Sequence, residues 1–109
     1  MITGGNMLYK LYLDDIRCPR HVGSGWLIAR SYEEAIEIVK QHECPFYVSF
    51  DHDLGDANAK TGYDFAKWLV EQDLDHGILP DNFDFNVHSA NPVGAANITG
   101  LLDSYLKTR

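Results

Sequence analysis

Runs of apolar and β-branched residues predict four short strands along the chain. These segments span residues 8–13, 26–29, 46–50 and 85–87. The run at 46–50 is apolar at nearly every position, as expected of a strand that is buried on both faces. Polar residues or Gly and Pro follow each run, and these residues are typical of turns. We therefore expect four separate strands.

Three further segments have apolar residues at helical spacing behind a residue that favours a helix start. The pairs that begin these helices are Ser31 and Glu34, Thr61 and Asp64, and Asn91 and Pro92. The first two pairs have the spacing of a capping box, and the third is an N-cap followed by a helix-initiating proline. Pro45 is expected to end the first helix, and Gly77 and Pro80 the second.

The order of these elements predicts the fold class. After one long loop, strands and helices alternate, which indicates parallel strands joined by right-handed crossovers. We expect a three-layer α/β domain with a parallel sheet of about four strands. At 109 residues, with no repeat or linker, the chain is predicted to form one domain over 1–109, in which 1–6 are a flexible extension.

Polar side chains follow three of the predicted strands at the point where each strand ends. They are Asp14, Asp15 and Arg17 after the first strand, Asp51, His52 and Asp53 after the third, and His88, Ser89 and Asn91 after the last. In open parallel sheets, ligands bind beyond the carboxyl ends of the strands. We therefore expect these three segments to form one site.

The aspartates of this set are candidate ligands for a divalent cation. Carboxylates that are brought together repel one another, so they must bind a cation or hold a proton. Asp14, Asp15, Asp51 and Asp53 offer the oxygen ligands that Mg²⁺ prefers, and the nearby histidines make Mn²⁺ or Zn²⁺ an alternative. For a single aspartate at a strand end, a turn or cap role is an equally good interpretation.

The remaining polar side chains suit proton transfer and phosphate binding. Histidine side chains titrate near neutral pH, so His52 and His88 are candidate general acid and base, with Asp51 as a third catalytic candidate. Four residues are expected to orient substrate oxygens: Arg17, Ser89, Asn91 and Arg30. Asn91 has an alternative role as a helix cap.

Composition narrows the classes of partner. The formal net charge of −7 argues against an extended nucleic-acid-binding face, although it permits a nucleotide or an RNA end. Two separated cysteines, no export signal and no apolar run of about 18 residues favour a cytoplasmic protein without a membrane span.

Trp26 and Trp68 are expected in the core rather than in a base-stacking platform. The open edge of a short sheet suggests a homodimer.

The polar segments together resemble the receiver domain of two-component response regulators. Asp14 and Asp15 match its acidic metal-binding pair, Asp51 matches its phospho-accepting aspartate, and Ser89 with Ala90 matches its hydroxyl-bearing switch position. The resemblance implies a flavodoxin-like, receiver-like sheet that is truncated relative to a full receiver. The fifth strand and its lysine have no counterpart here, and a loop takes the place of the first helix.

Four strings are similar to a narrower group, the cyclic-phosphate-processing receiver-like domains of bacteria and their phages. The strings are LYLDDIRCP, SFDHDLG, TGYDFAKWL and VHSANPVG, within a similarity that extends over residues 8–105. This resemblance implies action on cyclic phosphates, such as RNA 2′,3′-cyclic phosphate ends or cyclic nucleotides. By the receiver match, the backbone of Asp53 matters more than its carboxylate.

Three functions are compatible with these features. The first is a metal-dependent phosphoesterase that opens a cyclic phosphodiester. The second is a non-catalytic module that binds a nucleotide or a partner protein, and the missing fifth strand and lysine favour it. The third is a phospho-accepting signalling receiver, which ranks last for the same reason.

Overall fold

The computed structural model describes residues 9–19 and 25–109. Its strands are β1 (Lys10–Leu13), β2 (Trp26–Ala29), β3 (Tyr47–Phe50) and β4 (Asp84–Val87), and its helices are α1 (Tyr32–His42), α2 (Gly62–His76) and α3 (Pro92–Thr108). The predicted strands and helices are therefore confirmed, with small changes at their ends. The predicted extension 1–6 and the predicted first residue of the first strand lie outside the described residues.

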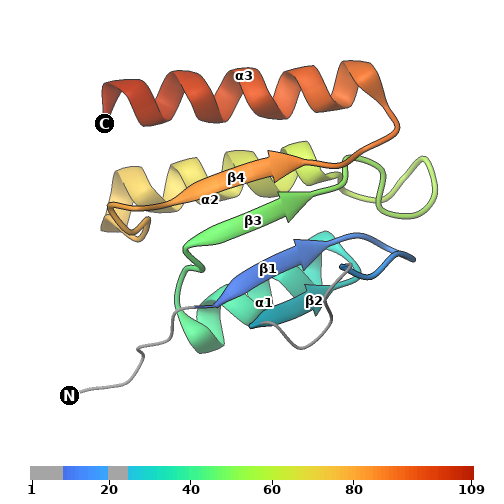
Figure 1. Ribbon diagram of the computed structural model, residues 1–109, viewed down its shortest axis with the longest axis horizontal. Coiled ribbons are helices and arrows are strands. Elements are labelled where there is room, and N and C mark those ends of the chain that lie inside the picture. The colour runs from blue at the N-terminus through green and yellow to red at the C-terminus, as the bar shows by residue number, and fades with distance from the viewer. Residues whose placement is uncertain (1–8, 20–24) are drawn as a thin grey trace.

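The four strands form one parallel sheet in the order β2-β1-β3-β4 (Figure 1). The residue after each of three strands extends the ladder by one backbone hydrogen bond. The Asp14 N–H donates to the Ala29 carbonyl at 3.1 Å, the Asp51 N–H to the Leu13 carbonyl at 2.9 Å, and the His88 N–H to the Phe50 carbonyl at 2.9 Å. These ladder positions place the three strand ends side by side at one edge of the sheet.

The hydrophobic core lies between one face of the sheet and the three helices. Leu11 and Leu13 of β1 and Val48 and Phe50 of β3 are fully buried on this face. They join a single cluster with helix residues that include Phe65, Leu69, Ile98 and Leu102. The predicted fold class, an α/β receiver-like domain with four parallel strands, is confirmed.

The opposite face of the sheet carries no helix among the described residues. Right-handed crossovers take α1 and α2 to the same face, and α3 packs beside α2 and β4. The described residues therefore form two layers, where three were expected. Trp26 lies on this open face and outside the hydrophobic core, so its predicted core position is wrong, whereas Trp68 packs against the core as expected.

Side-chain caps fix the helix starts that point toward the site. At α2, Thr61 and Asp64 form the complete reciprocal capping box. At α1, the Ser31 hydroxyl accepts from the Glu34 N–H at 3.1 Å, but the Glu34 carboxylate accepts from the Arg30 N–H at 2.6 Å. The predicted capping box of α1 is therefore shifted by one residue, because the Glu34 carboxylate accepts from the residue before the N-cap instead of from the N-cap itself.

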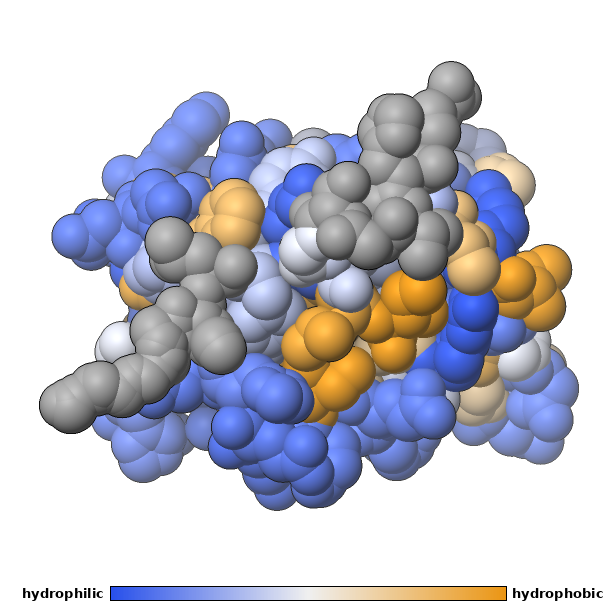
Figure 2. Space-filling model, turned by 60° about the horizontal axis from the view of Figure 1, so that its bottom comes forward, coloured by the Kyte–Doolittle hydropathy of each residue, from blue (hydrophilic) through white to orange (hydrophobic). Residues whose placement is uncertain are grey.

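The β2 edge of the sheet has no neighbouring strand among the described residues. A hollow of about 500 Å³ lies beside it, lined by Ile28, Glu33, Glu34, Glu37, Ile38 and Gln41. Figure 2 shows an apolar patch on the underside of the molecule, with polar side chains below it and on either side. The homodimer stays a prediction.

No helix in the described part of the chain is long and apolar enough to cross a membrane.

Candidate functional site

Asp14 lies at the centre of the candidate site and is fully buried. Its Oδ1 accepts hydrogen bonds from the backbone N–H groups of Ile16 and Arg17, both at 2.9 Å. Its Oδ2 accepts from Arg17 Nε at 2.8 Å and pairs with His88 Nε2 at 2.9 Å. A carboxylate has about four acceptor positions, so the hydrogen-bonding capacity of Asp14 is filled.

The environment of Asp14 favours its ionised form. Burial raises the pKa of the carboxyl, but the N–H groups of Arg17 and Ile16, the His88 imidazole and the Arg17 charge outweigh it. Together they lower the pKa to about 2. Asp14 therefore carries a negative charge at neutral pH and acts only as an acceptor.

The His88 imidazole is held on both nitrogens and stacked on one side. Nδ1 lies 2.7 Å from the Ser49 hydroxyl, and Nε2 faces Asp14. The Tyr12 ring stacks on the imidazole, with centroids 4.6 Å apart and planes 8° apart. Because ionised Asp14 only accepts, Nε2 is the nitrogen that donates to it, and Nδ1 is hydrogen-bonded to the Ser49 hydroxyl. Residues of β1 and β3 therefore fix the position of His88.

Two further carboxylates lie beside Asp14. Asp14, Asp15 and Asp51 can each offer one oxygen within 4.8 Å of the other two. Arg17 joins the group because its Nη2 lies 3.6 Å from Asp51 Oδ2. Asp51 is mostly buried, and Arg17 is half exposed at the surface of the group. We call Asp14, Asp15, Arg17, Asp51 and His88 the carboxylate cluster.

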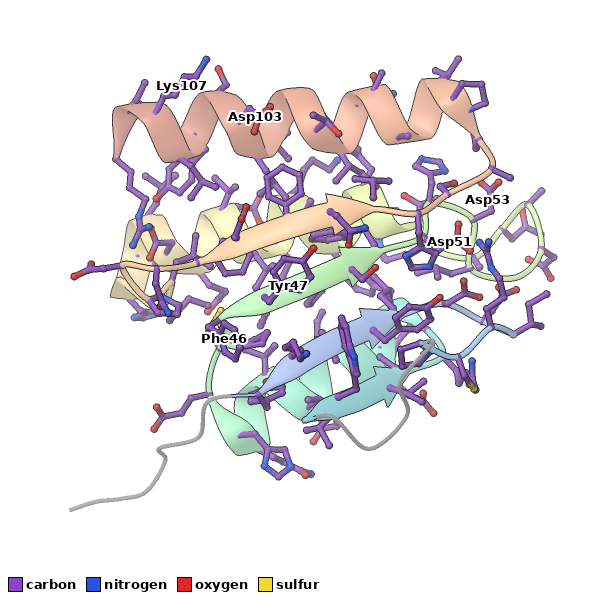
Figure 3. All side chains as sticks on the ribbon, viewed as in Figure 1. Phe46, Tyr47, Asp51, Asp53, Asp103 and Lys107 are labelled. Carbon is purple, nitrogen blue, oxygen red and sulfur yellow. The ribbon has the colours of Figure 1, made fainter. Side chains whose placement is uncertain are left out.

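A second group of polar residues follows Asp51 and shares no hydrogen bond with the carboxylate cluster among the described residues. His52 Nδ1 is 2.8 Å from Asp53 Oδ1, and the Asn91 amide donates to the Asp53 carboxylate at 3.4 and 3.5 Å. The His52 hydrogen bond lowers the pKa of the Asp53 carboxyl, burial raises it, and the Asn91 contact lowers it again, so the pKa lies below its ordinary value. Asp53 is not among the grouped carboxylates, and Figure 3 shows it beyond Asp51 in the loop after β3.

The ring of His52 packs against the backbone of Gly94 in the first turn of α3. A Cβ atom at Gly94 would collide with this ring, so glycine is required at that position. His52 also lines a hollow of about 420 Å³ formed by the loop after β3. His52 Nε2 bonds to no described residue, yet no described buried side-chain nitrogen or oxygen lacks a partner. This nitrogen is therefore accessible to solvent.

The other residues predicted to bind substrate have mainly structural contacts. Arg30 Nη1 donates to the backbone carbonyls of Arg17 at 2.6 Å and Asp14 at 3.1 Å, which holds the loop after β1. The Ser89 hydroxyl accepts from the Asn91 N–H at 3.1 Å. Asn91 caps α3 by accepting from the Gly94 N–H at 2.9 Å, the alternative role foreseen for it.

Three residues of the site were not foreseen from the sequence. They are Ser49, Tyr12 and Gly94. Ser49 left a signal, because a polar residue inside an apolar strand run needs a buried partner. Gly94 left a weaker one, since glycine in the first turn of a helix often marks a close contact. Nothing in the sequence pattern indicated that Tyr12 would stack on His88.

Fold and site together define a class: a receiver-like α/β domain whose strand ends gather aspartates, an arginine and a histidine at one edge. The sequence matches the family described as the cyclic-phosphate processing receiver domain over residues 9–104, and the chain belongs to that family. The predicted resemblance is thus confirmed, and with it a family associated with cyclic-phosphate processing. No curated protein and no solved structure matches the chain.

Proposed function

We propose that this protein opens cyclic phosphodiesters, such as the 2′,3′-cyclic phosphate of a nucleotide or of an RNA end, by adding water. The carboxylate cluster carries the proposal, because it combines an arginine with grouped carboxylates where parallel sheets bind ligands. Membership of a family associated with cyclic-phosphate processing supports the choice of substrate.

Arg17 is the residue that we assign to the phosphate group. Its Nε is bonded to Asp14 and its Nη2 faces Asp51, while 48% of the side chain is exposed. No described residue accepts a hydrogen bond from its Nη1. One side of the guanidinium fork is therefore free to donate to phosphate oxygens, and the two aspartates fix its orientation.

The grouped carboxylates fit a divalent cation. Asp14, Asp15 and Asp51 supply an all-oxygen donor set, which suits Mg²⁺ or Mn²⁺ better than Zn²⁺. A bound cation would polarise the phosphoryl group and offset charge that develops on its oxygens. Asp15 and Asp51 are the first candidates to hold it, because the oxygens of Asp14 already accept four hydrogen bonds.

Proton transfer is assigned to His52 rather than to His88. Both nitrogens of His88 face buried protein groups, so its imidazole positions Asp14 and is not free to meet a ligand. His52 presents a solvent-accessible Nε2, and Asp53 holds its other nitrogen. An imidazole with one nitrogen oriented by a carboxylate and the other free is the arrangement that general acid-base catalysis uses.

The proposed reaction consumes one water molecule. The water oxygen forms a bond to phosphorus, and one of the two ring P–O bonds breaks. The ribose oxygen that leaves gains a proton, and the attacking water loses one, so a single imidazole can return the proton that it accepts. The product is a phosphate monoester, which carries more negative charge toward Arg17 than the cyclic diester.

Hydrolysis of several 2′,3′-cyclic nucleotides tests the proposal, with Mg²⁺, Mn²⁺ or Zn²⁺ and with a chelator. We expect turnover by the wild-type protein and a loss of at least about 100-fold in kcat/KM for Arg17→Gln and Asp51→Asn. Asp84→Asn is the control, because Asp84 is an exposed carboxylate at the start of β4. Absence of turnover with every metal and substrate would contradict the proposal.

A second candidate function is a non-catalytic module that binds a cyclic nucleotide. It is favoured by one observation, that Asp14 and His88 have no free acceptor or donor position and form a static support for Arg17. Calorimetry separates the two candidates. Tight binding of a cyclic nucleotide that remains intact after prolonged incubation with each metal indicates the module.

A further inference from the structure

Aromatic side chains from three adjacent strands cover the open face of the sheet. Trp26 of β2 makes edge contacts with Tyr12 of β1 and Tyr47 of β3, with ring centroids 5.6 and 6.1 Å apart. Each of these side chains is only half-buried, and none belongs to the hydrophobic core. In Figure 3, Tyr47 projects from this face, and α1 and α2 lie behind the sheet. Accessible rings on a sheet surface are platforms on which unpaired bases stack.

One cation, Lys10, lies on this face among the described residues. Two further cations, Arg17 of the carboxylate cluster and Arg30 beside it, lie at the strand ends. Lys10 belongs to this face, and its Nζ lies 4.8 Å above the Trp26 ring. Asp84 lies at the far end of the face, beside Tyr47 in the register. The positive charge of Lys10 is complementary to a nucleic-acid backbone.

The aromatic face is continuous with the carboxylate cluster. Tyr12 stacks on His88, and His88 is bonded to Asp14. Trp26 on β2 and Tyr47 on β3 are the register partners of Lys10 on β1. Lys10 precedes Tyr12 by two residues on the same strand. Two residues along a strand span about 7 Å. The Tyr12 ring therefore lies next to the carboxylate cluster, and the rings of Trp26 and Tyr47 form a second row farther from it.

We propose that this face binds the last bases of a single-stranded RNA whose terminal phosphate lies at Arg17. The proposal rests on the proposed function and names its substrate as an oligonucleotide end rather than a free mononucleotide. The terminal base lies by Tyr12, the preceding base lies by Trp26 and Tyr47, and Lys10 faces the phosphate between them. A second copy of this chain is the alternative occupant, and the sedimentation experiment below distinguishes it.

Binding of two uncleavable probes tests this inference: uridine 3′-monophosphate and a uridine trinucleotide that ends in a 3′-phosphate. We expect the wild-type protein to bind the trinucleotide at least about tenfold more tightly than the mononucleotide. Trp26→Leu and Tyr47→Leu should each remove most of this advantage and leave mononucleotide affinity unchanged. Tyr63→Leu is the matched control, because Lys67 lies 5.2 Å above the Tyr63 ring on α2.

If a leucine variant does not fold, a second pair of variants tests the trinucleotide advantage. Lys10→Ala is the test variant of this pair, and Lys67→Ala is its control. If the wild-type protein binds neither probe, or if Trp26→Leu and Lys10→Ala keep the full trinucleotide advantage, the inference is wrong. It is also wrong if Trp26→Leu changes only a monomer–dimer equilibrium in sedimentation, since a second copy then occupies the face.

The test also separates this inference from the proposed reaction. Trinucleotide binding that depends on Trp26, without opening of any cyclic phosphate, would keep the RNA face and reject the reaction. Opening of cyclic mononucleotides without a trinucleotide advantage would keep the reaction and reject the RNA face.

Discussion

Asp14 and Arg17 set the chemistry of the site through the number of hydrogen bonds that a carboxylate can accept. Two backbone N–H groups, Arg17 and His88 occupy the acceptor positions of Asp14. A cation that bound to all three grouped carboxylates would need one of the positions that Arg17 or His88 now occupies. Arg17 and a divalent cation are therefore expected to compete for Asp14.

Arg17→Gln should bind Mn²⁺ about tenfold more tightly than the wild-type protein, which corresponds to about 1.4 kcal/mol. The substitution removes one positive charge from the carboxylate cluster and frees an oxygen of Asp14. Electron paramagnetic resonance of free Mn²⁺ measures the affinity. Lys40→Gln on the exposed side of α1 is the control for the change in net charge. Weaker Mn²⁺ binding by Arg17→Gln would show that Arg17 supports the cation instead of replacing it.

The residues of the site differ in how far the sequence predicts them. Asp14, Asp51 and His88 were predicted to lie together, because each follows a parallel strand and parallel strand ends share an edge. The sequence could not predict that His88 joins the carboxylate cluster whereas His52 pairs with Asp53. This difference depends on the direction in which each side chain points from the end of its strand. The loop-holding contacts of Arg30 depend in the same way on the path of a loop that has no periodic pattern.

Helix α3 makes contacts near both of its ends, with the loop after β3 at its start and with α2 at its end. Near its start, Gly94 touches the ring of His52. Near its end, Tyr105 and Arg109 contact the buried Asp73 of α2. The sequence predicted this helix from its cap and its apolar spacing, but long-range contacts of this kind carry no local signal.

Gly94→Ala and Gly100→Ala should have opposite effects on stability, although both lie in α3. Alanine at Gly100 meets no atom within 4 Å, so its higher helix propensity should add about 0.5–1 kcal/mol to the free energy of unfolding. Alanine at Gly94 collides with His52, so it should lower the unfolding temperature and shift the NMR signals of the His52 ring. An unchanged His52 signal in Gly94→Ala would contradict the described packing.

Asp73 should make the contact between α2 and α3 sensitive to acid. Burial raises the pKa of Asp73, but the Tyr105 hydroxyl, the Leu79 N–H and Arg109 together lower it below its ordinary value. A lowered folded pKa stabilises the fold above the unfolded pKa of about 3.9, and this contribution is lost as pH falls toward the folded pKa. The stability difference between the wild type and Asp73→Asn should therefore be largest above about pH 5 and shrink below about pH 4.

Chemical unfolding at a series of pH values measures this difference. A stability difference that is the same at every pH would contradict the account, since it would show that the charge of Asp73 contributes nothing to the contact.

At the scale of the whole molecule, helices cover one face of the sheet and the charge is unevenly distributed. The order of strands and helices predicted the parallel sheet correctly, because alternation restricts the crossovers to one hand. It did not predict the open face, because coverage depends on where loops and helices pack. The net charge of −7 was interpreted as unfavourable to an extended nucleic-acid-binding face but compatible with an RNA end, and it averages a basic segment at 10–30 with an acidic remainder.

Salt should therefore weaken the binding of the uridine trinucleotide even though the protein is acidic overall. With two or three phosphate contacts, the affinity should fall by about tenfold between about 50 and 200 mM salt. Lys10→Ala should reduce the slope of log affinity against log salt by about one, whereas Lys67→Ala should leave it unchanged. Equal slopes for the wild type and Lys10→Ala would remove Lys10 from the interface.

The most direct measurement of the central claim is ³¹P NMR of a 2′,3′-cyclic nucleotide incubated with the protein and Mg²⁺ in ¹⁸O-labelled water. Opening by water predicts that the cyclic signal is replaced by a monoester signal that carries one ¹⁸O on phosphorus. Arg17→Gln should slow this conversion strongly, and Asp84→Asn should not. A cyclic signal that persists unchanged with the wild-type protein, in Mg²⁺ and in Mn²⁺, would contradict the claim that the carboxylate cluster opens cyclic phosphates.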